Sequence, residues 1–208
     1  MSNVLHIRAI SHELQTFTEH LDALGMDSRS LRDMSAEDFL GRDVILIEAH
    51  TDQRALMNYR KELNQHLDNG GTIVFNGHLV YPIFDGLEMF KVAAGRGVKD
   101  LAVVREAEHP IFAGVDCHDL SFRRGVAGFY ARGANPAPEG AVVLHRLEAD
   151  GSPADWVWQR PNGGQFFMHG GNNMWMYIND KTSAARIAPQ LLAWVNNGAP
   201  VHTFAEQE

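Results

Sequence analysis

Short apolar runs alternate, in the first part of the chain, with segments whose apolar residues recur at helical spacing. Val4–Arg8, Asp43–Glu48 and Thr72–Phe75 are the apolar runs, and we expect each to form a buried strand. Between them, Ser11–Leu24 and Asp52–Leu67 carry apolar residues three or four positions apart, which predicts two helices. This β-α-β-α-β alternation predicts right-handed crossovers and a mainly parallel sheet.

Both predicted helices have recognisable ends. Gly25 closes the first, while Thr51 or Asp52 caps the start of the second and Asn69-Gly70-Gly71 ends it. The residues that we expect to face the core are Leu14, Phe17, Leu21 and Leu24 in the first helix and Leu56, Tyr59, Leu63 and Leu67 in the second. Ser35–Asp38, before Phe39, is typical of a brief capped turn.

The second half of the chain has a different pattern, with apolar runs separated by turn residues. We expect strands at Leu101–Arg105, Gly125–Arg132, Ala141–Leu147, Trp156–Gln159 and Gln165–Met168. The turn signals between them predict an antiparallel extension of the sheet. A closing amphipathic helix is expected over Ser183–Val195, ended by Asn197-Gly198. We expect one domain over residues 1–200 and a loose tail over 201–208.

Composition narrows the class of protein. No apolar run approaches the roughly 18 residues that cross a bilayer, and the start of the chain lacks a signal peptide, so a cytoplasmic protein is expected. The net charge of -8, without any Lys/Arg-rich run, argues against nucleic acid as a partner. Cys117 is the only cysteine, which excludes an internal disulfide and a multi-cysteine zinc site.

Three histidines each come directly after a predicted strand. His50, His78 and His169 would meet at one edge if those strands are parallel neighbours, because ligands bind at the carboxyl ends of such strands. Gly77 tolerates the positive φ of a tight turn before His78, and Asn76 precedes it. Imidazoles that converge can transfer protons or bind a divalent metal. In the alternative, each histidine only caps its strand.

A second unusual stretch follows the last predicted strand. Paired glycines at 170 and 171 expose the backbone, Asn172 and Asn173 offer amides, and Trp175 offers a flat face, a combination suited to sugars. The alternative is a glycine-rich turn in which asparagine is used for its backbone tolerance. Tyr81 and Trp156 could wall a pocket or belong to the core. His109-Pro110 predicts a rigid turn.

Several of these segments, in this order, resemble the class I glutamine amidotransferase-like superfamily and, within it, the trehalose-utilisation (ThuA-like) group. The segments are the Asp43 strand, the helix ending Leu67-Asp68-Asn69-Gly70-Gly71, the elbow Phe75-Asn76-Gly77-His78, His109-Pro110-Ile111, Gly163–His169 and the last helix ending Leu192-Ala193-Trp194. The resemblance implies an α/β fold, a flavodoxin-like three-layer sandwich with a mainly parallel sheet and an antiparallel extension in the C-terminal half.

The same resemblance implies a degenerate catalytic triad. Amidotransferases of the superfamily carry a cysteine at the elbow, a late histidine, and a glutamate two residues beyond it. Here the elbow residue is His78, the late histidine is His169, and Gly171 stands at the glutamate position. Without a thiolate no acyl-enzyme can form, so glutaminase activity is not expected. ThuA-like proteins also carry histidine at this elbow, which implies a link to carbohydrate metabolism.

Two hypotheses from different classes follow. In the first, the protein binds or transforms a small polyhydroxylated, sugar-like molecule, as a hydrolase or sugar-modifying enzyme. His78 and His169 would be catalytic, and a divalent metal remains open. The residues expected to bind substrate are His50, Asn76, Gly77, Tyr81, Asn172, Asn173 and Trp175. In the second, the chain is a non-catalytic binding or assembly module, and a homo-oligomer is open.

Overall fold

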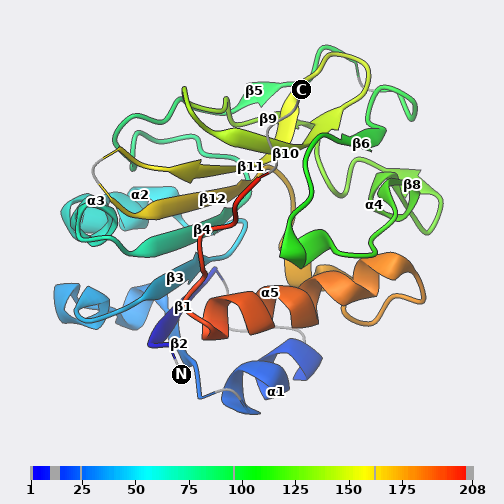
Figure 1. The fold of residues 1–208 in the computed structure, drawn as a ribbon. Coiled ribbons are helices and arrows are strands. Elements are labelled where there is room, and N and C mark those ends of the chain that lie inside the picture. The colour runs from blue at the N-terminus through cyan, green and yellow to red at the C-terminus, as the bar shows by residue number, and fades with distance from the viewer. Residues whose placement is uncertain (1, 10–14, 24, 96, 162, 205–208) are drawn as a thin grey trace.

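The computed structural model describes residues 2–9, 15–23, 25–95, 97–161 and 163–204. Its sheet strands are β1 (Val4–Arg8), β2 (Asp27–Ser30), β3 (Val44–Ile47), β4 (Thr72–Asn76), β6 (Val103–Arg105), β10 (Val142–Leu147), β11 (Pro153–Gln159) and β12 (Gln165–His169). They form one eight-stranded sheet in the order β2-β1-β3-β4-β12-β11-β10-β6 (Figure 1). Strands from both halves of the chain therefore share one sheet.

Strand direction divides this sheet into two parts. Strands β2, β1, β3, β4 and β12 run parallel to one another. Strands β11, β10 and β6 then add three antiparallel pairings at the β12 side. The five parallel strands follow the flavodoxin-like order. The predicted α/β sandwich with a mainly parallel sheet and an antiparallel extension is confirmed.

Helices cover both faces of the sheet (Figure 1). The helices are α1 (Gln15–Ala23), α2 (Gln53–Leu56), α3 (Arg60–Asp68), α4 (Cys117–Ser121) and α5 (Ile187–Asn196). Alternate residues of β3 enter different cores: Val44 and Leu46 pack in the cluster that holds α1 and α5 side chains, whereas Ile45 and Ile47 pack in the cluster that holds α2 and α3 side chains. This alternation is what a strand covered on both faces requires.

The second predicted helix is present but divided. α2 is followed by a 3-10 turn, η3 (Met57–Tyr59), and then by α3. Asp52 caps α2 by accepting from the N–H groups of Arg54 and Ala55, as predicted. The residues predicted to face the core, Leu56, Leu63 and Leu67, are buried, and the Tyr59 hydroxyl donates to the Met34 carbonyl at 2.6 Å.

The segment Gly125–Arg132 is not the sheet strand that the sequence predicts. Only β8 (Val126–Ala127) pairs there, in a hairpin with β7 (Phe122–Arg123), while β9 (Gly133–Ala134) pairs with β5 (Lys91–Val92). Gly125 and Gly128 have φ values of +77° and +83°, which break an extended strand. The prediction is wrong because these glycines direct the chain away from the sheet.

The sheet ends in a polar strand on one side and a very short strand on the other. Pattern analysis missed β2, whose residues are all polar and whose Asp27 forms ion pairs with Arg29 at 2.7 Å and Arg42 at 2.6 Å. At the other edge β6 has three residues, and the Arg105 guanidinium donates to the Val115 carbonyl at 2.7 Å. The β2 edge carries no apolar stripe, which explains why hydrophobicity did not reveal this strand.

Parts of two predicted elements lie outside the described residues. For the helix predicted over Ser11–Leu24, residues 10–14 and 24 are not described, and α1 accounts for the rest. In the predicted loose tail, residues 205–208 are not described, while the Phe204 ring packs 6.4 Å from that of His109.

No helix in the described part of the chain is long and apolar enough to cross a membrane.

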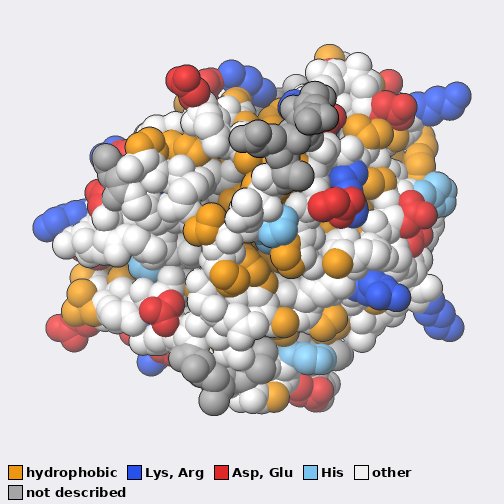
Figure 2. All heavy atoms as spheres, viewed as in Figure 1, with side chains coloured by type: hydrophobic (Ala, Val, Ile, Leu, Met, Phe, Trp, Pro, Cys, Tyr) orange, Lys and Arg blue, Asp and Glu red, His pale blue; other side chains and the backbone are white. Residues whose placement is uncertain are grey.

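Charge is dispersed on the face that carries α5. Figure 2 shows acidic and basic side chains interspersed there, with hydrophobic side chains between them. Such a mixed surface gives no single-sign patch on this face to attract a phosphate backbone.

Candidate functional site

Strand β4 ends in a tight elbow that brings His78 to the carboxyl edge of the sheet. Gly77 has a φ of +104°, donates its N–H to the His169 carbonyl at 2.8 Å, and accepts from the Asn135 amide at 2.9 Å. A Cβ at this position would lie 3.3 Å from the Ala49 Cα. Gly77 therefore meets both a backbone and a packing requirement, and the exposed His78 side chain follows it.

We predict that Gly77→Ala destabilises the protein by about 1–3 kcal/mol, because the alanine must hold a positive φ and press on the Ala49 backbone. Urea unfolding measures the loss. Gly140→Ala is the matched control, since Gly140 has a φ of +80° with nothing within 4 Å of its added Cβ. Equal losses in the two variants would show that the approach to Ala49 is unimportant.

The elbow forms one wall of a pocket of about 420 Å³. The pocket lies at the ends of β3, β4 and β12, where His50, His78 and the glycine-rich turn after His169 come together. Its lining residues are His50, Gln53, Gly77, His78, Val80, Gly128, Phe129, Ala131, Arg132, Gly171 and Asn172. The predicted edge of the sheet is thus where a pocket is found.

Hydrogen bonds fix the polar walls of this pocket. His50 has a φ of +64°, and its Nε2 atom lies 3.2 Å from the Asn172 Oδ1 atom. The Asn172 amide donates in turn to the Phe129 carbonyl at 3.1 Å. Gln53 holds the elbow by donating to the His78 carbonyl at 2.6 Å and accepting from the Val80 N–H at 2.9 Å. The walls are therefore organised without a ligand.

His78 is the pocket residue best suited to accept a proton. Its ring stacks on that of Phe90, with centroids 3.6 Å apart and planes 13° from parallel. Partial burial lowers the pKa of His78, and the nearby His50, Arg132 and His169 lower it further. The His78 imidazole is consequently neutral at pH 7 and available as a base or hydrogen-bonding group.

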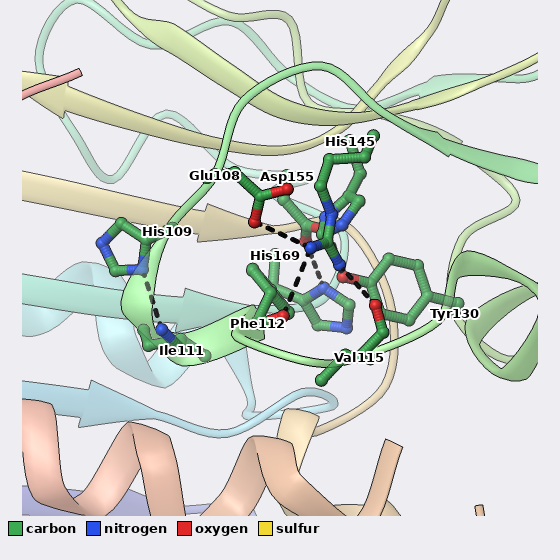
Figure 3. Close-up of polar contacts among 10 residues, drawn as sticks. Glu108, His109, Ile111, Phe112, Val115, Tyr130, His145, Asp155 and His169 are labelled. Carbon is green, nitrogen blue, oxygen red and sulfur yellow. Dashed lines mark hydrogen bonds and ion pairs between the residues drawn. The ribbon is translucent and has the colours of Figure 1, made fainter. Parts of the chain in front are cut away.

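His169 takes part in a buried cluster behind the pocket, which we call the Asp155 cluster: Tyr130, His145, Asp155 and His169 (Figure 3). The His169 Nδ1 atom lies 2.5 Å from one Asp155 oxygen, and the His145 Nδ1 atom lies 2.7 Å from the other. The Tyr130 hydroxyl also donates to Asp155. The two imidazoles hold the pKa of Asp155 far below its usual range against the opposing effect of burial.

The prediction that three imidazoles meet over one ligand is wrong for His169. Its side chain is fully buried, and Gly171, which lines the pocket, lies over it: a Cβ on Gly171 would be 3.0 Å from the His169 Nε2 atom. His50 and His78 do line one pocket. Among the described residues no three His, Cys, Asp or Glu side chains are grouped so as to hold a metal ion.

Two of the predicted substrate-binding asparagines brace the backbone instead of lining the pocket. The Asn76 amide is 1% exposed, donates to the Ile47 carbonyl at 3.0 Å and accepts from the Met174 N–H at 3.1 Å. The Asn173 side chain accepts from the Ala49 N–H at 2.6 Å. These bonds tie the ends of β3 and β4 to the turn after β12, so both residues position the pocket walls.

The three aromatic residues that were candidates for the pocket wall lie outside its lining. Trp175 is buried and stacks on Phe17 with ring centroids 4.6 Å apart, so its face is not available to a ligand. Tyr81 accepts at its hydroxyl from the Arg54 guanidinium at 2.6 Å, beside the pocket and not in its lining. Trp156 is fully buried and donates its indole N–H to the Asn135 carbonyl at 2.8 Å.

Sequence reasoning missed two charged residues at or behind the site. Asp155 stands within the apolar run Ala154–Val157, and a buried charge in a strand signals a paired partner. Arg132 reaches the pocket only because the chain after Gly128 leaves the sheet, which no local pattern indicates.

Cys117 begins α4 outside the pocket lining, and burial raises the pKa of its thiol, so it is a poor nucleophile.

Fold and site together define a doubly wound α/β protein whose elbow after β4 carries a histidine at the pocket. The mmIFT52 N-terminal domain is similar in structure, with a TM-score of 0.54 and 16% identity over 97% of this chain and 100% of that one. A protein of Thermoplasma acidophilum described as one of the subunits of GMP synthase is also similar, with a TM-score of 0.54 and 9% identity over 96% of this chain and 99% of that one.

No protein-family model matches the sequence, and no curated protein matches it. At 16% and 9% identity, the structural likenesses establish a shared fold and nothing about activity. The α/β fold of this chain is thus shared with both of these proteins, and it is the fold that the sequence predicted.

Proposed function

We propose that this protein binds a small polyhydroxylated, sugar-like molecule in the pocket between His50, His78 and Asn172. The observation that carries the proposal is the convergence of two imidazoles and an amide on a pocket of about 420 Å³ at the carboxyl ends of parallel strands. Imidazole and amide groups both donate and accept hydrogen bonds, as sugar hydroxyls do. The resemblance to the ThuA-like group supports the same class of ligand.

His78 is the group that we assign to proton transfer in this proposal. Its imidazole is exposed at the elbow and neutral at pH 7, so it can take a proton from a ligand hydroxyl. His50, bonded to Asn172, would orient the same ligand. The activity would not be amide hydrolysis through an acyl-enzyme, since the elbow offers no thiolate.

One observation favours a non-catalytic binding module as the second candidate. His169, at the position of the superfamily's catalytic histidine, is sealed beneath Gly171 and bonded to Asp155, so it cannot touch a ligand without rearrangement. A protein that kept the pocket and lost the chemistry would bind the ligand and return it unchanged. Turnover measurements separate the two candidates.

We predict that His78→Ala and His50→Ala each weaken binding of a sugar ligand about tenfold, the effect of losing one hydrogen bond of about 1–1.5 kcal/mol. Isothermal titration calorimetry with glucose, trehalose and myo-inositol measures the affinities, and NMR of the same samples detects turnover. His118→Ala, on an exposed histidine of α4, is the control and should leave affinity unchanged.

If no sugar, neutral or acidic, binds to the wild-type protein at millimolar concentration, the proposed function is wrong. If binding occurs but His78→Ala and His50→Ala behave like His118→Ala, the ligand lies elsewhere and the pocket assignment is wrong. Binding without turnover over days would favour the non-catalytic module.

A further inference from the structure

A second hollow, of about 560 Å³, adjoins the histidine pocket. The two share His78 and Arg132 in their linings. The other residues of the second hollow are all apolar: Phe90, Val92, Leu101 and Ala127. Val92 is 60% exposed at its rim. A polar pocket and an apolar hollow therefore meet at one imidazole and one guanidinium.

Arg132 is held in place at this junction. Its Nε atom donates to the Gly128 carbonyl at 2.9 Å. A Cβ on Gly128 would lie 3.1 Å from that Nε atom, so the missing side chain leaves room for the guanidinium to pack closely. Arg132 is exposed and forms no ion pair with any carboxylate in the described part of the chain. Its remaining N–H groups are free to bind an anion.

The linings of both hollows contain no Asp or Glu among the described residues. The formal charge of the whole chain is -8, so an acid-free lining with a fixed guanidinium contrasts with the rest of the molecule. An arginine with a fixed fork recognises a carboxylate or phosphate through paired hydrogen bonds. A ligand at this junction should therefore carry negative charge.

We propose that the ligand is an amphipathic sugar acid. Its hydroxyl groups lie against His50, His78 and Asn172, its acidic group binds Arg132, and an apolar or aromatic substituent fills the hollow lined by Phe90, Val92 and Leu101. This inference rests on the proposed function and narrows its ligand class. The stacked His78 and Phe90 rings form the boundary between the polar and apolar parts of the ligand.

Four matched probes test the two added features separately: methyl β-glucoside, methyl β-glucuronide, phenyl β-glucoside and phenyl β-glucuronide, each titrated calorimetrically into the full chain. We expect the carboxylate to raise affinity about tenfold to a hundredfold and the phenyl group to add about tenfold. Glucose 6-phosphate, as a fifth probe, shows whether phosphate replaces the carboxylate. The gain from the acidic group should shrink as salt rises.

Two variants test which residue provides each gain in affinity. Arg132→Gln should abolish the preference for glucuronides over glucosides, and Val92→Asp should abolish the preference for phenyl over methyl. Arg124→Gln, on an exposed arginine that pairs with Asp180, and Val201→Asp, on an exposed valine of the C-terminal segment, are the matched controls and should keep both preferences.

The outcomes distinguish this inference from the function on which it rests. Equal affinities for the four glycosides, or preferences that survive Arg132→Gln and Val92→Asp, would overturn the amphipathic acid and leave sugar binding intact. Failure of every probe, neutral and acidic, to bind would overturn both. Preference for glucose 6-phosphate over the glucuronides, lost in Arg132→Gln, would support the anion site with phosphate as its ligand group.

Discussion

Replacing Asp155 with asparagine is expected to lower the free energy of unfolding by about 3–5 kcal/mol, the typical cost of removing one partner of a buried ion pair. Asp155 is fully buried on β11 and is bonded on both oxygens: His145 and His169 approach it at 2.7 and 2.5 Å, and the Tyr130 hydroxyl donates to it. Asparagine has one acceptor oxygen and no charge. At least one buried donor of the Asp155 cluster would then lose its partner.

Urea unfolding at pH 7 measures this loss, with an unchanged dependence on denaturant confirming that the same surface is exposed. The control is Glu139→Gln on an exposed loop, which removes the same charge and should change stability by less than about 0.5 kcal/mol. A loss below about 1 kcal/mol for Asp155→Asn would show that the cluster contributes little to the fold.

The second large effect is a loss of stability in mild acid through His109. Burial, and after it the nearby His202, lower the pKa of His109 to about 3 against the opposing effect of Asp155. Its ring lies among aromatic neighbours, 5.3 Å from Trp194 and 5.5 Å from Phe167. As the pH falls, the unfolded chain takes up the proton first, near pH 6.5. The contribution of His109 is therefore complete above pH 6.5 and is lost between pH 6.5 and about 3.

The contribution of His109 alone should lower the free energy of unfolding by about 2.5 kcal/mol between pH 8 and pH 4.5. His109→Asn tests this: it keeps an acceptor for the Ile111 N–H, which the imidazole now caps at 3.3 Å, and it cannot titrate. The pH profile of the variant should be flatter by that amount, although its stability at pH 8 is lower because the ring is lost. Parallel profiles would contradict the prediction.

The comparison of wild type with the variant removes the contributions of the other titratable groups. Burial also lowers the pKa of His66 and His78, so the wild-type slope contains their contributions. Asp155, whose pKa is depressed, gives up its contribution only as the pH falls below about 4. The difference between wild type and His109→Asn above pH 4.5 thus isolates His109.

Local patterns predicted the fold well wherever a strand is buried on both faces. Val44–Ile47 and Thr72–Phe75 are continuous apolar or β-branched runs because helices cover both faces of the sheet, and this pattern is visible in the sequence. The polar edge strand Asp27–Ser30 carries no such signal. The segment 125–132 was predicted to be a strand despite its glycines, and only the positive φ values of Gly125 and Gly128 show that the chain turns there.

The pocket residues were predictable only in part, because sequence patterns show where strands end but not which side chains reach solvent. His50 and His78 were found because the ends of parallel strands share an edge, which is a property of topology. Whether a residue at that edge reaches solvent depends on what covers it. Gly171 covers His169 through the conformation of a local turn, which the residue spacing does not reveal. The Phe17 ring covers Trp175 through a long-range contact, which no local pattern encodes.

The two margins of the sheet have a consequence for how copies of this chain behave at high concentration. A long apolar margin would template strand addition and fibre growth. Here one margin is charged, through Asp27 and Arg29, and the other spans only Val103–Arg105. Lateral polymerisation through backbone pairing is therefore disfavoured, and association between molecules would have to use side-chain complementarity.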